Sequence, residues 1–234
     1  MIDFHTHILP EMDDGSQSPE ESVRMLQLLR QQGVDTVIAT SHFYSNQDNP
    51  DNFLARRAEA VQKIPYDPDT MPKLLLGAEV TYFWSMDRSR ELSRLCIGES
   101  PVILIEMSFQ KWTKRMVSDV CNMHRMGYIP VLAHVDRYWK RGQFLTYRRR
   151  LRKANVLFQC NADAFLPKQF GGRMIRMIKK GYIHFIGTDF HNMENRISRI
   201  DLATERIAQK LGQETLDAMD RHATHILSQK RKIK

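Results

Sequence analysis

The sequence predicts an α/β fold built on a parallel sheet. Short, continuously apolar segments rich in β-branched residues alternate with longer segments of helical periodicity. Continuous apolar runs are typical of parallel strands that are covered on both faces. The 234 residues contain no low-complexity linker and no repeat of fixed period, and one large domain can be built from this length.

Seven strands are predicted in order along the chain. They span residues 2–7, 35–42, 73–80, 102–107, 129–134, 155–161 and 183–189. This alternation suits a closed or distorted (β/α) barrel and also an open doubly wound sheet. No G-x-G-x-x-G or P-loop sequence follows a strand, so neither a dinucleotide site nor a P-loop site is indicated.

The intervening segments carry helix signals. In the first, Ser18 is placed to cap the helix, with Pro19 at its first position and Glu21 at its third. Glycines are placed to end three of the helices, at Gly33, Gly127 and Gly181. Further helices are predicted within residues 51–64, 111–126, 171–180, 197–211 and 213–228.

Composition narrows the class of protein. The chain is 42% hydrophobic and 26% charged, and no apolar run approaches the roughly 18 residues of a membrane span. Without a signal-peptide pattern at residue 1, we expect a cytoplasmic protein with no membrane insertion. Cys96, Cys121 and Cys160 form no C-x-x-C pair, and none begins the C-x5-R loop of cysteine-dependent tyrosine phosphatases.

The net charge of +8 is concentrated in two places, residues 137–153 and 229–234. We predict one domain over residues 1–228 and a basic tail over 229–234. Segment 137–153 has two interpretations, a solvated helix face or a docking surface for an anionic partner. The tail is expected to be frayed.

Polar residues that can bind metals lie at or near the ends of the predicted strands. They are His5, His7, His42, Glu79, Glu106, His134, Asp189 and His191. The carboxyl ends of parallel strands gather at one end of a barrel or sheet, where catalytic groups also gather. His5 and His7 are two residues apart on one strand, so both imidazoles can point at one ion.

The carboxylates strengthen the metal hypothesis. Glu106 ends an apolar strand and Glu79 follows a run of leucines, where an unpaired charge would be costly. A mixed imidazole and carboxylate set without thiolate suits manganese, iron or zinc. There are too many ligands for one ion, so two or three ions are expected. Such clusters activate water and stabilise phosphoryl transfer.

Two arginines could complete a phosphate site. Arg137 lies three residues after His134, and Arg196 lies five residues after His191. A guanidinium can bind two phosphate oxygens at once. The alternative for each arginine is an ordinary surface ion pair.

Taken together, six motifs resemble the PHP (polymerase and histidinol phosphatase) superfamily. They are IDFHTHILPEMDDGS, ATSHFY, GAEV, IEMSF, AHVDRY and GTDFHN, and they extend from residue 2 to about residue 196. Within the superfamily they are most similar to the bacterial manganese-dependent protein tyrosine phosphatases of capsule and exopolysaccharide synthesis.

The resemblance implies a distorted (β/α)7 barrel with a trinuclear metal centre, manganese being the expected metal. It implies hydrolysis of phosphotyrosine on a bacterial tyrosine kinase that controls polysaccharide assembly, with phosphate-binding roles for Arg137 and Arg196. Self-association is plausible among such enzymes, although no residue indicates a homo-oligomer here. Metal-ligand roles are implied for His5, His7, Asp14, His42, Glu79, Glu106, His134, Asp189 and His191.

The chain departs from the superfamily pattern at Ser41, Val135, Asp136 and Phe190. None of these is an expected ligand. Phe190 would narrow the pocket and Val135 would shift the backbone before Arg137, which affects the substrate range more than the chemistry.

The predicted mechanism is direct hydrolysis, with His42 or Asp14 as the candidates for a general acid. One rival is a histidinol phosphatase or another small-molecule phosphoesterase of the same superfamily. Another is a non-enzymatic metal-stabilised scaffold or a nucleic-acid binder. Aromatic stacking platforms for RNA are not evident, so no nucleic-acid partner is expected.

Overall fold

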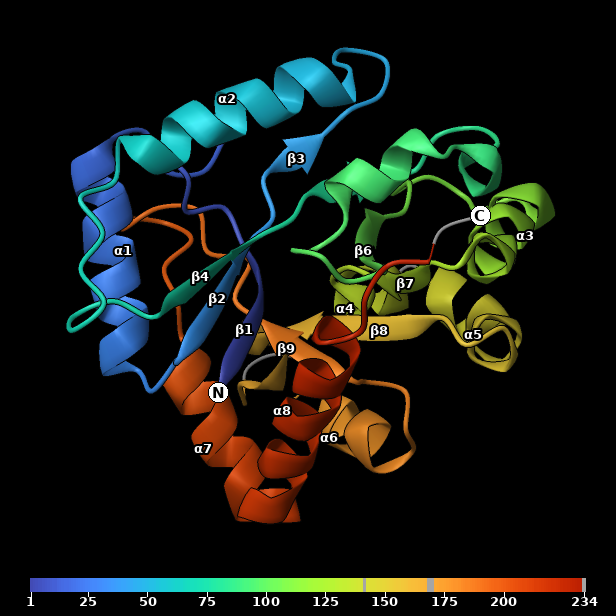
Figure 1. Cartoon of the computed structure of the whole chain (residues 1–234). Helices are drawn as coiled ribbons and strands as arrows, with labels where there is room; N and C mark the ends of the chain where they lie inside the picture. Colours follow the sequence, from blue (N-terminus) through green and yellow to red (C-terminus); the bar gives the residue numbers. More distant parts are fainter. Residues whose placement is uncertain (141, 168–170, 233–234) are drawn as a thin grey trace.

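The computed structural model describes residues 1–140, 142–167 and 171–232 of the chain (Figure 1). Arg141 of the basic segment and residues 233–234 of the predicted tail lie outside the described residues. Within the described residues, no helix is long and apolar enough to cross a membrane.

All strand pairs of the fold are parallel. The strands are β1 (Ile2–Thr6), β2 (Thr36–Ala39), β3 (His42–Phe43), β4 (Lys73–Leu76), β5 (Glu79–Thr81), β6 (Val102–Glu106), β7 (Ile129–Leu132), β8 (Leu157–Asn161) and β9 (Phe185–Gly187). They form two sheets, with the orders β1-β2-β4 and β3-β5-β6-β7-β8-β9.

The two sheets join into one curled sheet. Beyond the end of β9, the Asp189 N–H donates to the His5 carbonyl at 2.8 Å, and the His7 N–H donates to the Phe190 carbonyl at 2.9 Å. On the other side, β3 continues β2 and β5 continues β4 along the chain. The predicted distorted barrel is thereby confirmed, and the open doubly wound sheet is excluded.

The prediction of seven uninterrupted strands is wrong at two points. Thr40 and Ser41 separate β2 from β3, and Gly77 and Ala78 separate β4 from β5. At the first break the Thr40 hydroxyl lies 3.1 Å from both the Thr6 N and the Thr6 carbonyl oxygen, so a side chain takes the place of ladder bonds. Below the break β2 pairs with β1 and β4, whereas above it β3 pairs with β5, the continuation of β4, so the pairing with β1 ends there.

Helices surround the sheet, and six of the eight described α-helices follow the predicted segments, whereas the two within residues 135–153 were not among those predicted. They are α1 (Pro19–Gln31), α2 (Pro50–Gln62), α3 (Lys114–Asn122), α4 (Val135–Lys140), α5 (Gln143–Lys153), α6 (Gly171–Lys179), α7 (Ile200–Leu211) and α8 (Gln213–Leu227). The Ser18 side chain caps α1 by accepting from the Glu21 N–H, as predicted. Glu21 accepts instead from the Gln17 N–H at 2.9 Å, one residue earlier than a capping box requires.

Two apolar clusters lie on the two faces of the sheet. Adjacent residues of β6 belong to different clusters, Ile103 to the larger and Leu104 to the smaller, as alternation along a strand requires. The smaller cluster includes Phe4, which stacks on Phe185 at 4.2 Å between ring centroids. Ala223 and Ile226 bring α8 against this cluster.

The tail is attached to the domain where it is described, so the expectation of a frayed tail is wrong there. The Arg231 guanidinium donates to the carbonyls of Ser93 and Gly98, and its backbone N–H donates to the Glu99 carbonyl at 3.2 Å.

Candidate metal centre

The eleven residues singled out from the sequence lie in one connected cluster. Each of the eleven has a carboxylate, imidazole or guanidinium atom within 3.7 Å of such an atom in another member, and these contacts connect the whole set. Most are buried, whereas the Asp14 side chain is 63% exposed and marks the mouth of the site. The barrel therefore brings the ends of its strands together as the alternation predicted.

The centre of the cluster is formed by His5, His7, Glu79 and Asp189. The Nε2 atoms of His5 and His7 lie 3.0 Å apart. Glu79 Oε2 lies 3.3 Å from the first and 3.5 Å from the second, and Asp189 Oδ1 lies 3.7 Å and 3.5 Å from them. Two imidazole nitrogens and two carboxylate oxygens thus face one point.

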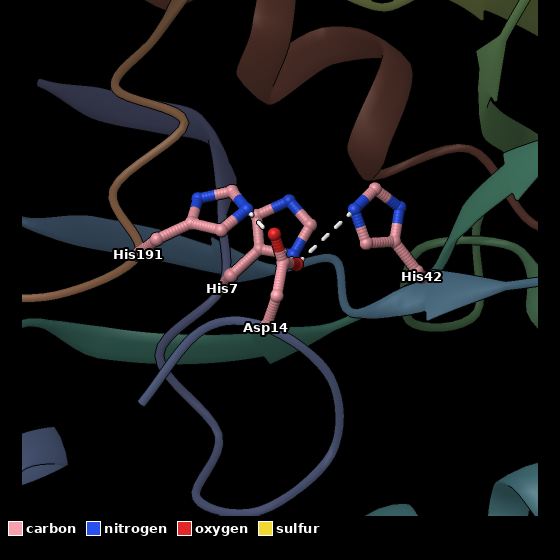
Figure 2. Close-up of side chains that lie close together, drawn as sticks. All are labelled: His7, Asp14, His42 and His191. Carbon is pink, nitrogen blue, oxygen red and sulfur yellow. Dashed lines mark ion pairs between the residues drawn. The ribbon is translucent and has the colours of Figure 1, made fainter. Parts of the chain in front are cut away.

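A second group lies toward the mouth. Asp14 Oδ1 is 3.3 Å from His191 Nε2 and 3.5 Å from His42 Nε2. Figure 2 shows these three side chains and His7 pointing toward one another, with Asp14 rising from the loop after β1. One ligand atom from each of the four lies within 4.8 Å of those from the others.

A third group surrounds Glu106. His134 Nε2 is 2.9 Å from Glu79 Oε1 and 3.3 Å from Glu106 Oε1. Glu79 Oε2 also lies 3.0 Å from His42 Nδ1. Glu79 therefore contacts all three groups, which is the position expected of a bridging carboxylate.

Arg137 and Arg196 lie at the rim, with 35% and 36% of their side chains exposed. Both guanidiniums contact the outer oxygen of Asp189, and that of Arg196 does so at 2.9 Å. Arg196 also lies 3.4 Å from Asp14 Oδ2. Asp189 thus turns one oxygen to the histidines and the other to the arginines.

The charges of the cluster are strongly coupled. Burial disfavours the charged form of His7, yet the Asp13 and Glu79 carboxylates raise its pKa to about 10. Glu106 and Glu79 likewise overcome burial at His134 and raise its pKa to about 9. The neighbouring histidines in turn hold the pKa of buried Glu79 well below its usual range.

The donor set fits divalent cations. Glu79 Oε2, His42 Nδ1 and His191 Nε2 are buried and form no hydrogen bond, although each lies within ion-pair distance of another group of the cluster, so a shared cation would satisfy them. Imidazole and carboxylate donors without thiolate suit manganese, iron or zinc. A cation would replace the protons that the coupled histidines carry.

Two of the residues at this site have unusual backbone conformations. His134 and Asp189, each two residues after the end of a strand, have positive φ angles of 32° and 55°. Such angles are rare for residues other than glycine and cluster at functional sites. At Asp189 this conformation turns the chain just after β9 and aims the carboxylate into the cluster.

Supporting residues were not predicted from the sequence. Asp13 accepts from His7 Nδ1 and from the His42 N–H, both at 2.8 Å. Gln159 Oε1 accepts from the His134 N–H at 2.6 Å and lies 3.3 Å from His5 Nδ1. Asn161 donates to Asp189 at 3.0 Å. Two polar residues at alternate positions of an apolar strand were the available signal for Gln159 and Asn161.

The expectation that Phe190 narrows the pocket is wrong. Its ring is fully buried in the larger core cluster, and its backbone carbonyl holds His7. The pocket at the mouth is instead bounded by Asp14, His42, Tyr44 and Arg56, among others, with a volume of about 680 Å³.

Comparison with known proteins identifies the relationship. A family described as capsular polysaccharide synthesis, CpsB/CapC, matches residues 1–227. The chain belongs to this family. It is 28% identical to the tyrosine-protein phosphatase CpsB of Streptococcus pneumoniae, over 91% of each chain. It is 27% identical to the tyrosine-protein phosphatase YwqE of Bacillus subtilis, over 92% of this chain and 86% of the relative.

The fold of this CpsB/CapC chain also matches a solved structure. That structure comes from work on YwqE and CpsB, described as unique metal-dependent tyrosine phosphatases. The TM-score is 0.81 at 25% identity, over 100% of this chain and 97% of the other. The resemblance inferred from the motifs is therefore confirmed over the whole chain.

Proposed function

We propose that this chain is a metal-dependent protein tyrosine phosphatase that acts on a bacterial tyrosine kinase of capsular or exopolysaccharide synthesis. The observation that carries this proposal is the cluster in which Glu79 contacts three groups of imidazole and carboxylate donors, with two arginines at the rim. The activities named for its CpsB and YwqE relatives support the same substrate class.

Nine residues would hold two or three ions, with Glu79 as a bridge. Manganese is the proposed metal, and iron or zinc suits the same donors. When bound, such ions activate water and neutralise charge on the phosphoryl group. The nine are His5, His7, Asp14, His42, Glu79, Glu106, His134, Asp189 and His191.

Arg137 and Arg196 would bind the phosphate. Both guanidiniums now lie against one carboxylate oxygen of Asp189, at the boundary between buried cluster and solvent. A phosphate ester entering from the mouth would offer them oxygens of the same charge and hydrogen-bonding geometry. They would then stabilise the charge that develops on the phosphoryl oxygens during transfer.

The leaving group reduces the demand for a general acid. A tyrosine phenolate, with a pKa of about 10, leaves more readily than an alkoxide. His42 and Asp14 lie at the mouth and are the candidates for a general acid, but a metal-bound imidazole or carboxylate has no proton to give, so both are better explained as metal ligands. The His42 side chain is 14% exposed and that of Asp14 is 63% exposed.

A phosphocysteine route is disfavoured by the state of the thiols. Burial raises the pKa of Cys96 to about 12 and raises the pKa of Cys160 well above its usual range. A thiol that stays protonated is a poor nucleophile. All three cysteines are free, which agrees with the reduced environment of a cytoplasmic enzyme.

The test compares three substrates before and after metal removal. We expect turnover of p-nitrophenyl phosphate and of a phosphotyrosine peptide, loss of both after chelation, and recovery with added manganese. Full activity of a metal-stripped sample would contradict the metal role. Faster turnover of histidinol phosphate than of the peptide would favour the small-molecule phosphoesterase instead.

A further inference from the structure

The larger of the two concentrations of positive charge extends over one stretch of the sequence. Residues 107–153 contain twelve lysines and arginines and two aspartates, so the rest of the chain is slightly acidic. Both aspartates, Asp119 and Asp136, are buried. Five exposed side chains of this stretch form what we call the basic face, namely Lys111, Lys114, Arg149, Arg150 and Lys153. Within the described residues, none of the five forms an ion pair.

The basic face extends over two neighbouring helices and the residues just before the first of them. In Figure 1, α3 and α5 lie together beyond β7 and β8, with α4 leading into α5. Arg150 of α5 donates to the Ser118 hydroxyl of α3 at 2.6 Å. Charges from two separate segments therefore share one surface instead of being spread around the molecule.

An aromatic pocket connects this face to the metal centre. The Phe109 ring stacks on the His134 ring at 5.7 Å between centroids, with 17° between their planes. Phe109 also lines a pocket of about 520 Å³ together with Lys111, Trp112 and Tyr147. Gln143 at the start of α5 accepts from the Trp112 N–H at 2.7 Å and fixes the pocket wall. A chain leaving the metal centre past Phe109 would enter the pocket and then meet the basic face.

The length of α5 and the size of the aromatic pocket suit a short peptide. The eleven residues of α5 give it a length of about 16 Å, which about five residues of an extended peptide would cover. The pocket has room for one side chain beside the reacting residue. Because the face carries uncompensated positive charge, acidic side chains are the complement it would select.

We propose that the aromatic pocket and the basic face bind acidic residues that flank the phosphotyrosine of a protein substrate. This inference rests on the proposed phosphatase function and adds a substrate preference to it. None of the five basic residues belongs to the proposed catalytic set, so the face would act on recognition of the polypeptide and leave the chemistry unchanged.

The test uses the metal-loaded enzyme and three substrates. They are p-nitrophenyl phosphate, a phosphotyrosine peptide with flanking glutamates, and the same peptide with glutamines in their place. The variant Lys111→Gln, Lys114→Gln and Arg149→Gln removes three charges from the basic face. The matched control, Arg24→Gln, Lys73→Gln and Lys210→Gln, removes three exposed charges elsewhere.

We expect kcat/KM for the acidic peptide to fall about tenfold in the basic-face variant at low salt, and less at high salt. The value for p-nitrophenyl phosphate should not change, and the control variant should match the wild type on all three substrates. Equal turnover of the two peptides by the wild type would overturn the inference. So would an equal loss in both variants.

Failure of the phosphatase proposal would look different, because the wild type would then hydrolyse neither phosphotyrosine peptide, or would hydrolyse both far more slowly than histidinol phosphate. The other anionic surface that such a face could meet is a membrane. Binding to anionic phospholipid vesicles that depends on the three charges, without discrimination between the peptides, would overturn the peptide proposal in favour of a lipid surface.

Discussion

Asp13 illustrates how one carboxylate can order a site without being among its predicted ligands. It accepts from His7 Nδ1 and from the His42 N–H, and its other oxygen accepts from the Gly15 N–H at 2.9 Å. A hydrogen bond to Nδ1 fixes the tautomer that leaves Nε2 free for a cation. Although Asp13 is largely buried, the charge of His7 holds its pKa far below the usual range, so it stays a carboxylate.

We predict that Asp13→Asn weakens manganese binding about 10- to 100-fold while the fold is retained. Competition with a chromogenic chelator would measure the affinity, and circular dichroism would report the fold. Asp48→Asn is a suitable control, because Asp48 lines the same pocket but pairs with Arg56 and contacts no predicted ligand. An unchanged affinity in Asp13→Asn would rule out this role.

The sequence could identify the residues of the site but not their partners. His5, Glu106 and His134 were recognisable because each ends an apolar strand, where a lone polar group is unusual. The contact of His5 with Gln159 joins residues 154 positions apart, and no local pattern encodes it. Such pairings follow from the curvature of the sheet. The sequence predicts the fold class but not that curvature.

At the level of elements, the closure of the barrel depends on a glycine in β9. A Cβ added at Gly187 would lie 2.6 Å from the His5 Cβ and 2.9 Å from the His5 backbone nitrogen. β1 and β9 therefore approach too closely for any side chain. The same approach places His5 beside Asp189 in the cluster.

We predict that Gly187→Ala destabilises the protein by about 1–3 kcal/mol and displaces His5. Urea unfolding would give the stability, and the loss of activity should exceed the loss expected from unfolding alone. Gly172→Ala on α6 is the control, because a Cβ there meets nothing within 4 Å. A fully stable and active Gly187→Ala variant would show that the two strands can separate without cost.

The sequence did not predict the breaks within two of the strands. Residues 35–42 and 73–80 were predicted as single strands because their apolar character continues across Thr40 and Gly77. Apolar residues lie on both sides of each break, so the composition does not reveal it. The break lies where the pairing with β1 ends, which is a tertiary effect that local propensity cannot report.

The contact between β8 and β9 also predicts a dependence of stability on pH. Nδ1 of His184 accepts from the Phe158 N–H at 3.0 Å, which requires the neutral ring. Burial, together with the charges of His222 and Arg152, lowers the pKa of His184 to about 4. Between pH 6.5 and 4 the unfolded chain binds a proton that the folded chain does not, so stability falls as the pH falls.

We predict that lowering the pH from 7.5 to 5 costs the wild type about 2 kcal/mol more than it costs His184→Asn. Asparagine keeps an acceptor at that position and does not titrate. Urea unfolding of both proteins at the two pH values measures the difference. Parallel losses in the two proteins would show that His184 does not contribute to the acid sensitivity.

At the scale of the whole molecule, one end of the barrel holds the proposed metal ligands and the other is packed with apolar side chains. The predicted ligands and both arginines lie in the last residues of the barrel strands or in the segments after them, while the smaller core cluster and α8 lie against the sheet away from them. The larger cluster packs the helices onto the outside of the barrel. The apolar core that holds the fold together is thus largely separate from the charged cluster, and the domain should fold without its ions.

Metal removal therefore should lower stability without unfolding the protein. Ions that bind only the folded chain stabilise it by about 2.7 kcal/mol at a hundredfold excess over the dissociation constant. For a chain of this length that stabilisation corresponds to a rise in Tm of about 5–10 °C.

We predict this rise in Tm when manganese is added to chelated protein, measured by thermal unfolding followed by circular dichroism. Glu79→Gln, which removes the charge shared by all three groups, should abolish most of the rise. Unfolding upon chelation at 25 °C would instead mean that the ions are required for the fold itself.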